Sequence, residues 1–164
     1  MRPAKMDFPV RKGFTLVELL IVTVIIGILA GSLLLVFGSA RNRSTSTRVI
    51  SDLMTLKRVS SMFYYDTGRW PGEEDYGALQ YYIDRDALAG DWSDETKIYG
   101  IRHPEGSDSV FAAARVSDGN GISLGVRESL EKEAPKYNLV NEDGITSYTS
   151  GNDIVMVLLR ILEP

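Results

Sequence analysis

The chain has 164 residues, of which 44% are hydrophobic and 24% charged, and its formal net charge is −4. This composition fits one modest folded domain with appendages and argues against overall disorder. The chain has no cysteine, which excludes disulfides, zinc–thiolate centres and cysteine nucleophiles. Residues 1–13 carry four basic residues against one acidic residue, a net charge of +3, which leaves −7 for the remainder. This acidic part of the chain has no general electrostatic attraction to nucleic acid, so the protein is not expected to bind nucleic acid.

Residues 14–37 form an apolar run in which Glu18 is the only charged residue. About 20 apolar residues suffice to cross a bilayer as a helix, so the run is long enough with some tilt. A secretory signal has a shorter apolar core that precedes its cleavage site. Here the obvious processing site, Lys12-Gly13-Phe14, precedes the apolar run. Residues 1–13 are therefore expected to be a leader, and residues 14–37 a transmembrane or filament-core helix that survives processing.

Residues 12–30, KGFTLVELLIVTVIIGILA, closely resemble the prepilin signature of type IV pilins and type II secretion pseudopilins. The resemblance implies that a prepilin peptidase cuts between Gly13 and Phe14 and methylates the new amino terminus of Phe14. Glu18, fifth after the cut, matches the family's characteristic glutamate, which meets the amino terminus of a neighbouring subunit and sets the axial register.

Physical chemistry also singles out Glu18. A carboxylate near the end of a membrane helix is costly without a partner, and the first turn of a helix favours negative charge. Two alternatives stay open at this point. Glu18 could lie unpaired at the membrane interface, or the whole segment could be an uncleaved anchor.

The resemblance also implies partners and a location. The partners are prepilin peptidase, copies of the chain or related pilins, the inner-membrane assembly machinery and the lipid bilayer. The chain would cross the cytoplasmic membrane once, with its head outside the cytoplasm, and then enter a periplasmic or cell-surface filament. Charge alone does not set this orientation, because Arg41, Arg43 and Arg48 balance the leader.

Residues 38–66 are expected to continue the helix as an amphipathic segment. Apolar residues spaced by three or four predict a stripe that faces a core: Val49, Leu53, Leu56, Val59 and Phe63. The helix should end near Asp66-Thr67-Gly68, shortly before Pro71. The segment Tyr64–Pro71 is similar to the helix exit of major pseudopilins, where a D-x-G-x-aromatic-P pattern recurs.

Residues 67–164 are expected to form a globular head. Its apolar runs predict strands near Lys97–His103, Ser109–Val116 and Asp153–Leu162, and a helix at Ser123–Glu133 that Pro135 terminates. A short strand at Ile145–Tyr148 could pair with the last strand across a turn at residues 149–152. The predicted fold class is α+β: a long N-terminal helix, membrane-spanning in its first half, packs its second half against a small antiparallel sheet, as in the pilin fold.

No catalytic motif occurs in the head, so no enzyme is expected. The single histidine, His103, is interpreted as an exposed loop residue. Oxygen-bearing side chains in turns are weak calcium candidates: Asp118, Asn120, Asn141, Asp143, Asn152 and Asp153. The same residue types simply favour turns, and the chain lacks the usual run of the C-terminal calcium loop of major pseudopilins. No cofactor is therefore expected, with calcium as a minor alternative.

The leading interpretation is a structural subunit of a type IV pilus or a type II secretion pseudopilus. The alternative is a membrane-anchored binding module, for example for DNA uptake or adhesion. In that case an aromatic cluster near the helix exit could form a ligand surface: Phe63, Tyr64, Tyr65, Trp70, Tyr76, Tyr81 and Tyr82. Packing between the helix and the head is the preferred explanation of this cluster.

Overall fold

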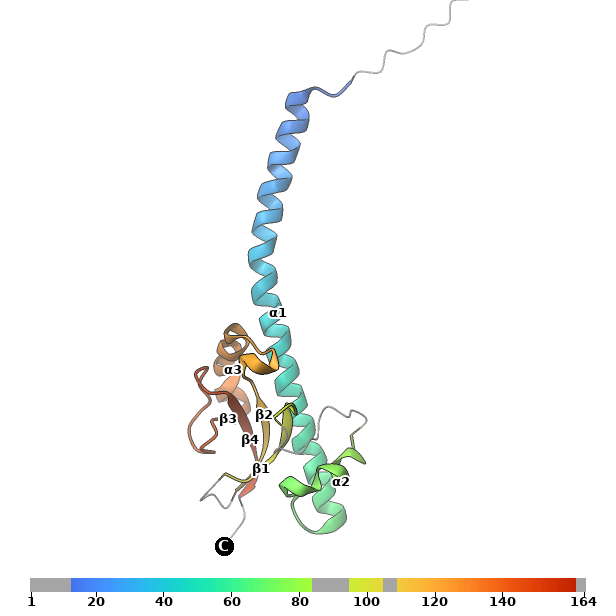
Figure 1. Cartoon of the computed structure of the whole chain (residues 1–164), viewed down its shortest axis with the longest axis vertical. Coiled ribbons are helices and arrows are strands. Elements are labelled where there is room, and N and C mark those ends of the chain that lie inside the picture. Colours follow the sequence, from blue (N-terminus) through green and yellow to red (C-terminus); the bar gives the residue numbers. More distant parts are fainter. Residues whose placement is uncertain (1–12, 84–94, 105–108, 162–164) are drawn as a thin grey trace, which may run out of the picture. The chain divides into compact units, whose positions relative to one another are not determined.

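The computed structural model describes residues 13–83, 95–104 and 109–161 (Figure 1). The chain divides into two compact units, one that ends at Gly38 and one that begins at Ser39. The elements follow the order α1, η1, α2, β1, β2, η2, α3, β3 and β4. The expected α+β class with a long N-terminal helix and a small antiparallel sheet is confirmed.

Helix α1 comprises Leu16–Thr67, and no proline lies within it. It begins with a capping box, in which the Thr15 hydroxyl accepts from the Glu18 amide at 3.2 Å and Glu18 accepts from the Thr15 amide at 2.8 Å. It ends at Thr67, and the next residue, Gly68, has a φ of +77°, the left-handed conformation that favours glycine. The Gly68 amide donates to the Tyr64 carbonyl at 2.8 Å, which closes the last turn. The predicted end of the helix is confirmed.

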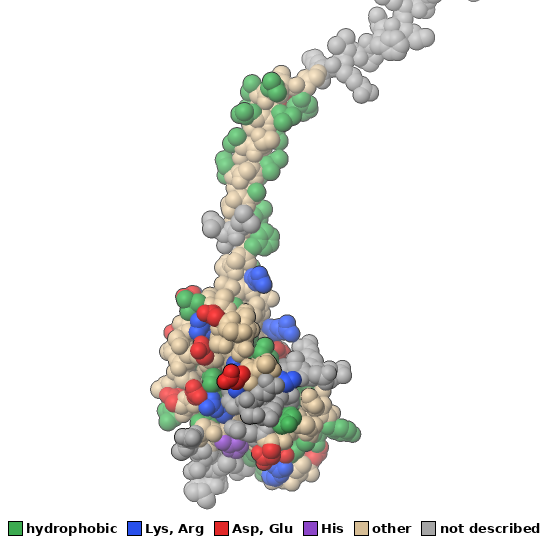
Figure 2. Space-filling model, viewed as in Figure 1, with side chains coloured by type: hydrophobic (Ala, Val, Ile, Leu, Met, Phe, Trp, Pro, Cys, Tyr) green, Lys and Arg blue, Asp and Glu red, His purple; other side chains and the backbone are tan. Residues whose placement is uncertain are grey.

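The first unit contains the apolar part of α1. Within the described residues, α1 is the one helix that is long and apolar enough to cross a membrane. The hydrophobic side chains that the structure describes here are exposed all round, with Leu16 90% and Ile25 51% exposed, and Figure 2 shows them along this part of the helix. A helix that is apolar on every side needs lipid or other helices around it.

The second unit contains a four-stranded antiparallel sheet in the order β1-β2-β4-β3. The central strands are β2, Ser109–Arg115, and β4, Ile154–Ile161. Strand β1, Tyr99–Arg102, and the two-residue strand β3, Leu139–Val140, form the edges. The register pairs Ala112 with Val157, and a bulge falls between Val110 and Phe111. The three predicted strands are thus confirmed within one or two residues over the described part of the chain.

Both faces of the central strands are buried. Alternate residues such as Ala112 and Val157 join the main core, and Phe111, Ala113 and Met156 form a smaller cluster on the other face. Successive side chains in a strand point to opposite faces, so covering both faces requires a continuously apolar strand. This explains why residues 154–159 show no alternation of polar and apolar residues.

The predicted stripe of α1 lies in the main core. All five of its residues are at most 4% exposed: Val49, Leu53, Leu56, Val59 and Phe63. The same core contains Leu130 of helix α3, which comprises Leu124–Tyr137. The amphipathic segment therefore joins the sheet and α3, as expected.

The core also encloses one carboxylate of α1. Asp52 is 4% exposed, and the Arg48 guanidinium Nε lies 3.8 Å from its Oδ2. Burial and the neighbouring Asp52 raise the pKa of Tyr99 above its ordinary value, so the phenol stays protonated and can donate to the carboxylate. Partners of this kind reduce the cost of burying a charge.

Two predictions in the head were wrong. Pro135 does not terminate α3, which continues to Tyr137 and ends at Asn138 with a φ of +52°. Pro135 has no amide to donate to the Glu131 carbonyl, so the helix loses one hydrogen bond there and continues for only two more residues. Nor is there a strand at Ile145–Tyr148: β3 pairs with β4 at this edge, and Ser147 makes a single bridge to Val140.

Besides β3, three short helical elements were not predicted. They are η1, Glu73–Asp75; α2, Tyr76–Gln80; and η2, Asp118–Asn120. Each is five residues or fewer, too short to show hydrophobic periodicity. The predicted turn before β4 is present, because the Asn152 amide donates to the Thr149 carbonyl at 3.1 Å.

Candidate processing and assembly site

The residues of the predicted processing site lie directly before α1. Gly13, Phe14 and Thr15 have no regular structure, and Phe14 is 81% exposed. A Cβ added to Gly13 would meet no atom within 4 Å. An uncrowded segment without helical structure can enter a protease cleft, whereas a helical one must first unwind.

Glu18 lies in the first turn of α1 and is held by Thr15. Its Oε2 accepts from the Thr15 amide at 2.8 Å and from the Thr15 hydroxyl at 2.9 Å. The sequence interpretation missed the role of Thr15, although the spacing Thr-x-x-Glu before an apolar run is the signal of a capping box. The carboxylate is thus oriented toward the helix start, four residues from Phe14.

The second motif, at the helix exit, has a structural explanation for each of its residues. Asp66 accepts from the Tyr82 hydroxyl at 2.7 Å, and Gly68 adopts the left-handed conformation. Trp70 stacks on Tyr64 with ring centroids 4.9 Å apart, and Pro71 is buried. The D-x-G-x-aromatic-P pattern therefore ends the helix and turns the chain back toward the head.

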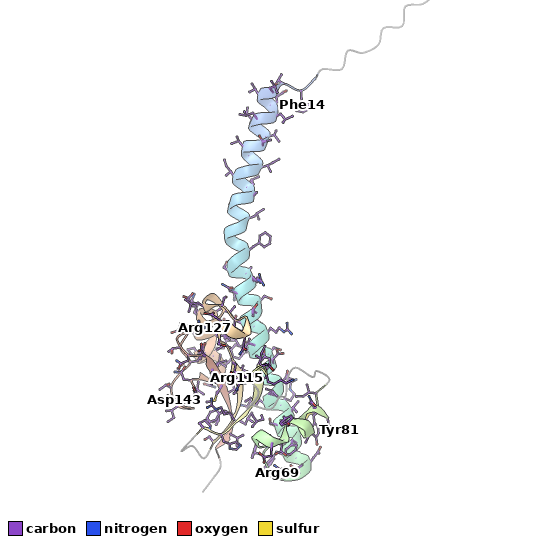
Figure 3. All side chains as sticks on the ribbon, in the orientation of Figure 1. Phe14, Arg69, Tyr81, Arg115, Arg127 and Asp143 are labelled. Carbon is purple, nitrogen blue, oxygen red and sulfur yellow. The ribbon has the colours of Figure 1, made fainter. Side chains whose placement is uncertain are left out.

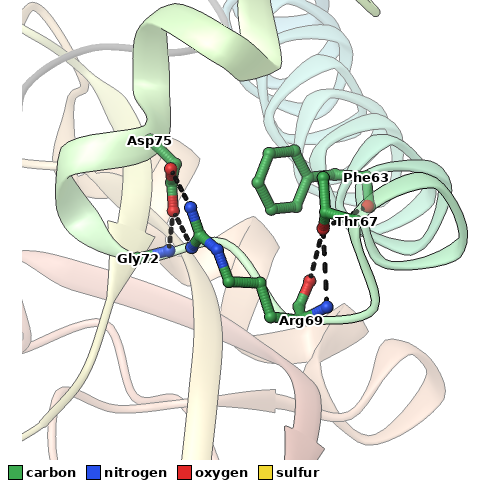
Figure 4. A network of polar contacts seen from close by, with 5 residues as sticks. All are labelled: Phe63, Thr67, Arg69, Gly72 and Asp75. Carbon is green, nitrogen blue, oxygen red and sulfur yellow. Dashed lines mark hydrogen bonds and ion pairs between the residues drawn. The ribbon is translucent and has the colours of Figure 1, made fainter.

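An arginine clamp, missed by sequence reasoning, fixes this turn (Figure 4). Arg69 donates to both oxygens of Asp75, with Nη1–Oδ2 2.6 Å and Nη2–Oδ1 2.8 Å, and the Gly72 amide donates to the same carboxylate at 2.8 Å. The Arg69 guanidinium also lies 5.2 Å from the Phe63 ring centroid. The hydrogen bonds from Arg69 lower the pKa of Asp75 from its ordinary value.

The calcium candidates are engaged with protein groups. Arg127 Nη1 lies 2.9 Å from Asp153, and Arg127 Nη2 lies 3.5 Å from Asp118. Asp143 accepts from the amides of Ile145 and Thr146, both at 2.9 Å. In this arrangement the Arg127 guanidinium neutralises Asp118 and Asp153, and the Asp143 carboxylate serves to order its own loop.

The remaining candidates likewise show no cation geometry. The described residues contain no group of three or more histidine, cysteine, aspartate or glutamate side chains placed to hold a metal. Asn141 donates to Thr146 Oγ1 at 2.8 Å, and Asn152 to Thr149 Oγ1, also at 2.8 Å. Asn120 is the last residue of η2, and the exposed His103 directly follows β1.

The aromatic cluster is only partly core. Phe63 is 3% exposed, whereas Tyr65 and Tyr81 are 85% and 90% exposed. The expectation of packing thus holds for Phe63, Tyr64, Trp70 and Tyr82, but not for these two tyrosines, and Tyr76 is 37% exposed.

Comparison with known proteins identifies the N-terminal segment. Residues 9–34 match the family model described as the prokaryotic N-terminal methylation motif. The chain is also similar to the type II secretion system core protein G of Klebsiella pneumoniae, with 33% identity over 64 residues, 39% of this chain and 46% of that protein. The proteins of the same name from Pectobacterium carotovorum subsp. carotovorum and Dickeya chrysanthemi are 30% and 31% identical, over 39% and 42% of this chain and 41% and 46% of their own lengths.

The chain thus spans less than half the length of the curated relatives it matches. No solved structure matches it significantly. The expected resemblance to the pilin and pseudopilin family is confirmed by the methylation motif and by these relatives.

Proposed function

We propose that the chain is a structural subunit of a pilus-like filament, most closely a type II secretion pseudopilus. The single observation that carries the proposal is the placement of Gly13-Phe14 in a non-helical segment directly before an apolar helix whose first turn presents Glu18. The name of the relatives, type II secretion system core protein G, favours the pseudopilus over other filaments.

Cleavage after Gly13 would create a new amino terminus at Phe14. An α-amino group has a pKa near 8, and methylation to a secondary amine keeps its positive charge. Both hydrogen bonds from Thr15 go to Oε2 of Glu18, so Oε1 can accept from a donor on another chain. Glu18 of one subunit then pairs with the Phe14 amine of a neighbour and sets the axial register.

The energetics of assembly follow from the helix surface. The exposed apolar side chains of α1 are satisfied either in lipid or among identical helices, so moving between the two changes little apolar area in contact with water. The pairing of Glu18 with the Phe14 amine and the packing between helices can then decide whether the subunit stays in the membrane or joins the filament. The subunit would reside in the cytoplasmic membrane until prepilin peptidase and the inner-membrane machinery transfer it to the filament.

The first test is the intact mass of the protein from its native membrane, with N-terminal peptide sequencing. A mature chain that starts at methylated Phe14 supports the proposal, and a chain that still starts at Met1 contradicts it. The second test is Glu18→Ala, which we expect to be cleaved normally but to form few filaments by electron microscopy. Thr23→Ala, which removes a hydroxyl bonded only within its helix, is the matched control.

A second candidate function rests on the exposed Tyr65 and Tyr81. A membrane-anchored binding head could use them as a ligand surface. Ligand binding by such a head would not depend on Glu18. The same Glu18→Ala variant therefore distinguishes a binding module from a filament subunit.

A further inference from the structure

A single large apolar side chain is exposed at the tip of the loop between β3 and β4. Ile145 is 85% exposed. The loop around it is held by its own side chains, because Asp143 Oδ1 accepts from the amides of Ile145 and Thr146 at 2.9 Å. Asn141 Oδ1 accepts from the Thr149 amide at 3.0 Å and thereby closes the loop behind the tip.

The backbone of this loop is also anchored to the sheet. Gly144 has a φ of +70°, and a Cβ at this position would lie 2.7 Å from Cζ of the Phe111 ring. The chain therefore passes directly over the smaller apolar cluster. An apolar residue on a rigid loop can bind a partner without the entropic cost of ordering that loop.

A partly apolar hollow, suited to an apolar side chain such as that of Ile145, lies between α1 and α3 of the same unit. Its volume is about 270 Å³. Apolar groups contribute part of its lining, namely Ile50, which is 5% exposed, and the half-buried Met54 and Tyr137.

The charged groups at this hollow are Arg43, Lys136 and Glu133. Lys136 Nζ lies 3.8 Å from Glu133 Oε2 and 4.8 Å from the Tyr137 ring centroid. Two cations against one carboxylate leave a net charge of +1 here.

The loop tip and the hollow match in size and in charge. An isoleucine side chain is small enough for the hollow, and large apolar anchors in pockets carry much of the energy of protein interfaces. Beside Ile145 lies the carboxylate of Asp143, shown on its loop in Figure 3. Hydrogen bonds from Thr146 and Ile145 lower the pKa of Asp143, so it remains ionised opposite the positive hollow. Glu142 is already paired with Arg102 at 2.6 Å and adds no net charge.

We propose that Ile145 of one copy of this chain inserts into the hollow between α1 and α3 of a neighbouring copy. The inference rests on the proposed filament function and names a contact between heads. Because the loop and the hollow are different surfaces, the contact is heterologous, and repeating it produces an open helical array unless the rotation happens to close. Glu18 would set the register at the membrane end of the helix, and this contact would set the spacing of the heads.

The absence of cysteine permits a direct test in the full-length chain in cells that assemble it. Ile145→Cys is combined with Ser51→Cys, an exposed residue that lines the hollow. After mild oxidation we expect a ladder of covalent dimers and larger multimers on denaturing gels, and only monomers from either single variant. The matched control combines Ser51→Cys with Tyr81→Cys, because Tyr81 is 90% exposed and Figure 3 shows it on the opposite side of the head from Asp143.

Filament formation by each variant, seen by electron microscopy, separates the two proposals. Filaments without a ladder would overturn the head contact and leave the filament function standing. An equal ladder from the Tyr81→Cys control would also overturn it. If the parent chain forms no filament under conditions where its leader is removed, the proposed function itself fails.

A second variant tests the contact without crosslinking. Ile145→Asp is expected to lower filament yield at least tenfold at unchanged protein level, while Ile145→Leu retains it. Since Ile145 is exposed, neither change disturbs the fold. Equal yields from the two variants would contradict the proposal.

Discussion

At the residue scale, several positions that define this chain act through backbone geometry. Gly144 combines a left-handed φ with close approach to Phe111, so a side chain is excluded for two independent reasons. Gly151, near the end of the same loop, has neither constraint, since nothing lies within 4 Å of its added Cβ and its φ is not positive.

We therefore expect Gly144→Ala to lower the free energy of unfolding by more than about 1 kcal/mol, because alanine is strained at positive φ and its methyl group meets the Phe111 ring. Thermal unfolding of the detergent-solubilised chain measures this. Gly151→Ala is the matched control and should stay within roughly 0.5 kcal/mol of the parent. Equal effects of the two substitutions would contradict the strain argument.

The clamp between Arg69 and Asp75 predicts a dependence on pH. The folded-state pKa of Asp75 is lowered, so its contribution to stability is complete above the ordinary aspartate value of 3.8 and is lost as the pH falls through the folded pKa. Arg69 is largely exposed, so screening by solvent keeps this contribution small.

Asp75→Asn should accordingly be less stable than the parent at pH 7, and the difference should shrink as the pH is lowered below 3.8. Unfolding curves at a series of pH values check this. Glu128→Gln, at an exposed position of α3, is the control and should run parallel to the parent. A difference for Asp75→Asn that persists at the lowest pH would refute the electrostatic explanation.

At the scale of elements, the amphipathic part of α1 dominates the packing of the head. Leu53 is fully buried in the main core, whereas Met62 on the same helix is 51% exposed. Leu53→Ala should lower the free energy of unfolding by about 2–5 kcal/mol, since it removes buried methyl groups and leaves a cavity. Met62→Ala should change it by roughly 0.5 kcal/mol or less. Denaturant titration of the two variants measures the contrast, and similar losses would argue against this core.

The elements that could be predicted are those whose signal is local. The spacing from Val49 to Phe63 marks the buried stripe without knowledge of any partner, and the apolar run at Ile154–Leu159 marks β4. The capping box at Thr15 and Glu18 is equally local, although it was overlooked.

The rest depended on contacts between distant parts of the chain. Arg127 bridges Asp118 and Asp153, which are 9 and 26 residues away, so these aspartates look in sequence like turn or calcium residues. The loop at residues 141–151 takes its shape from the packing of Gly144 over Phe111, 33 residues earlier. The local sequence does not reveal this contact, so Ile145–Tyr148 was wrongly predicted as a strand. The predicted helix ended too early at Pro135, because the sequence alone does not show that α3 continues to a C-cap at Asn138.

At the scale of the whole molecule, the proposed location follows from the motif and not from charge. The leader's net +3 is balanced by Arg41, Arg43 and Arg48 just after the apolar run, so the charge distribution favours neither orientation. The proposed processing would place the leader in the cytoplasm, within reach of the peptidase, and the head on the other side. This assignment can be tested because the chain has no cysteine of its own.

A single cysteine placed at Tyr81, which is 90% exposed, should react with a membrane-impermeant maleimide in intact spheroplasts. A cysteine placed at Lys5, in the leader, should react only after the membrane is permeabilised. The second variant is assayed in cells without the peptidase, so that the leader stays attached. The physical reason is that the reagent cannot cross the bilayer, so each thiol reports the side of the membrane on which it lies.

Labelling of the leader in intact spheroplasts would mean the opposite orientation, in which the proposed peptidase could not reach its cleavage site. Labelling of Tyr81→Cys alone would place the head, with its Ile145 loop and its hollow, where neighbouring copies can meet.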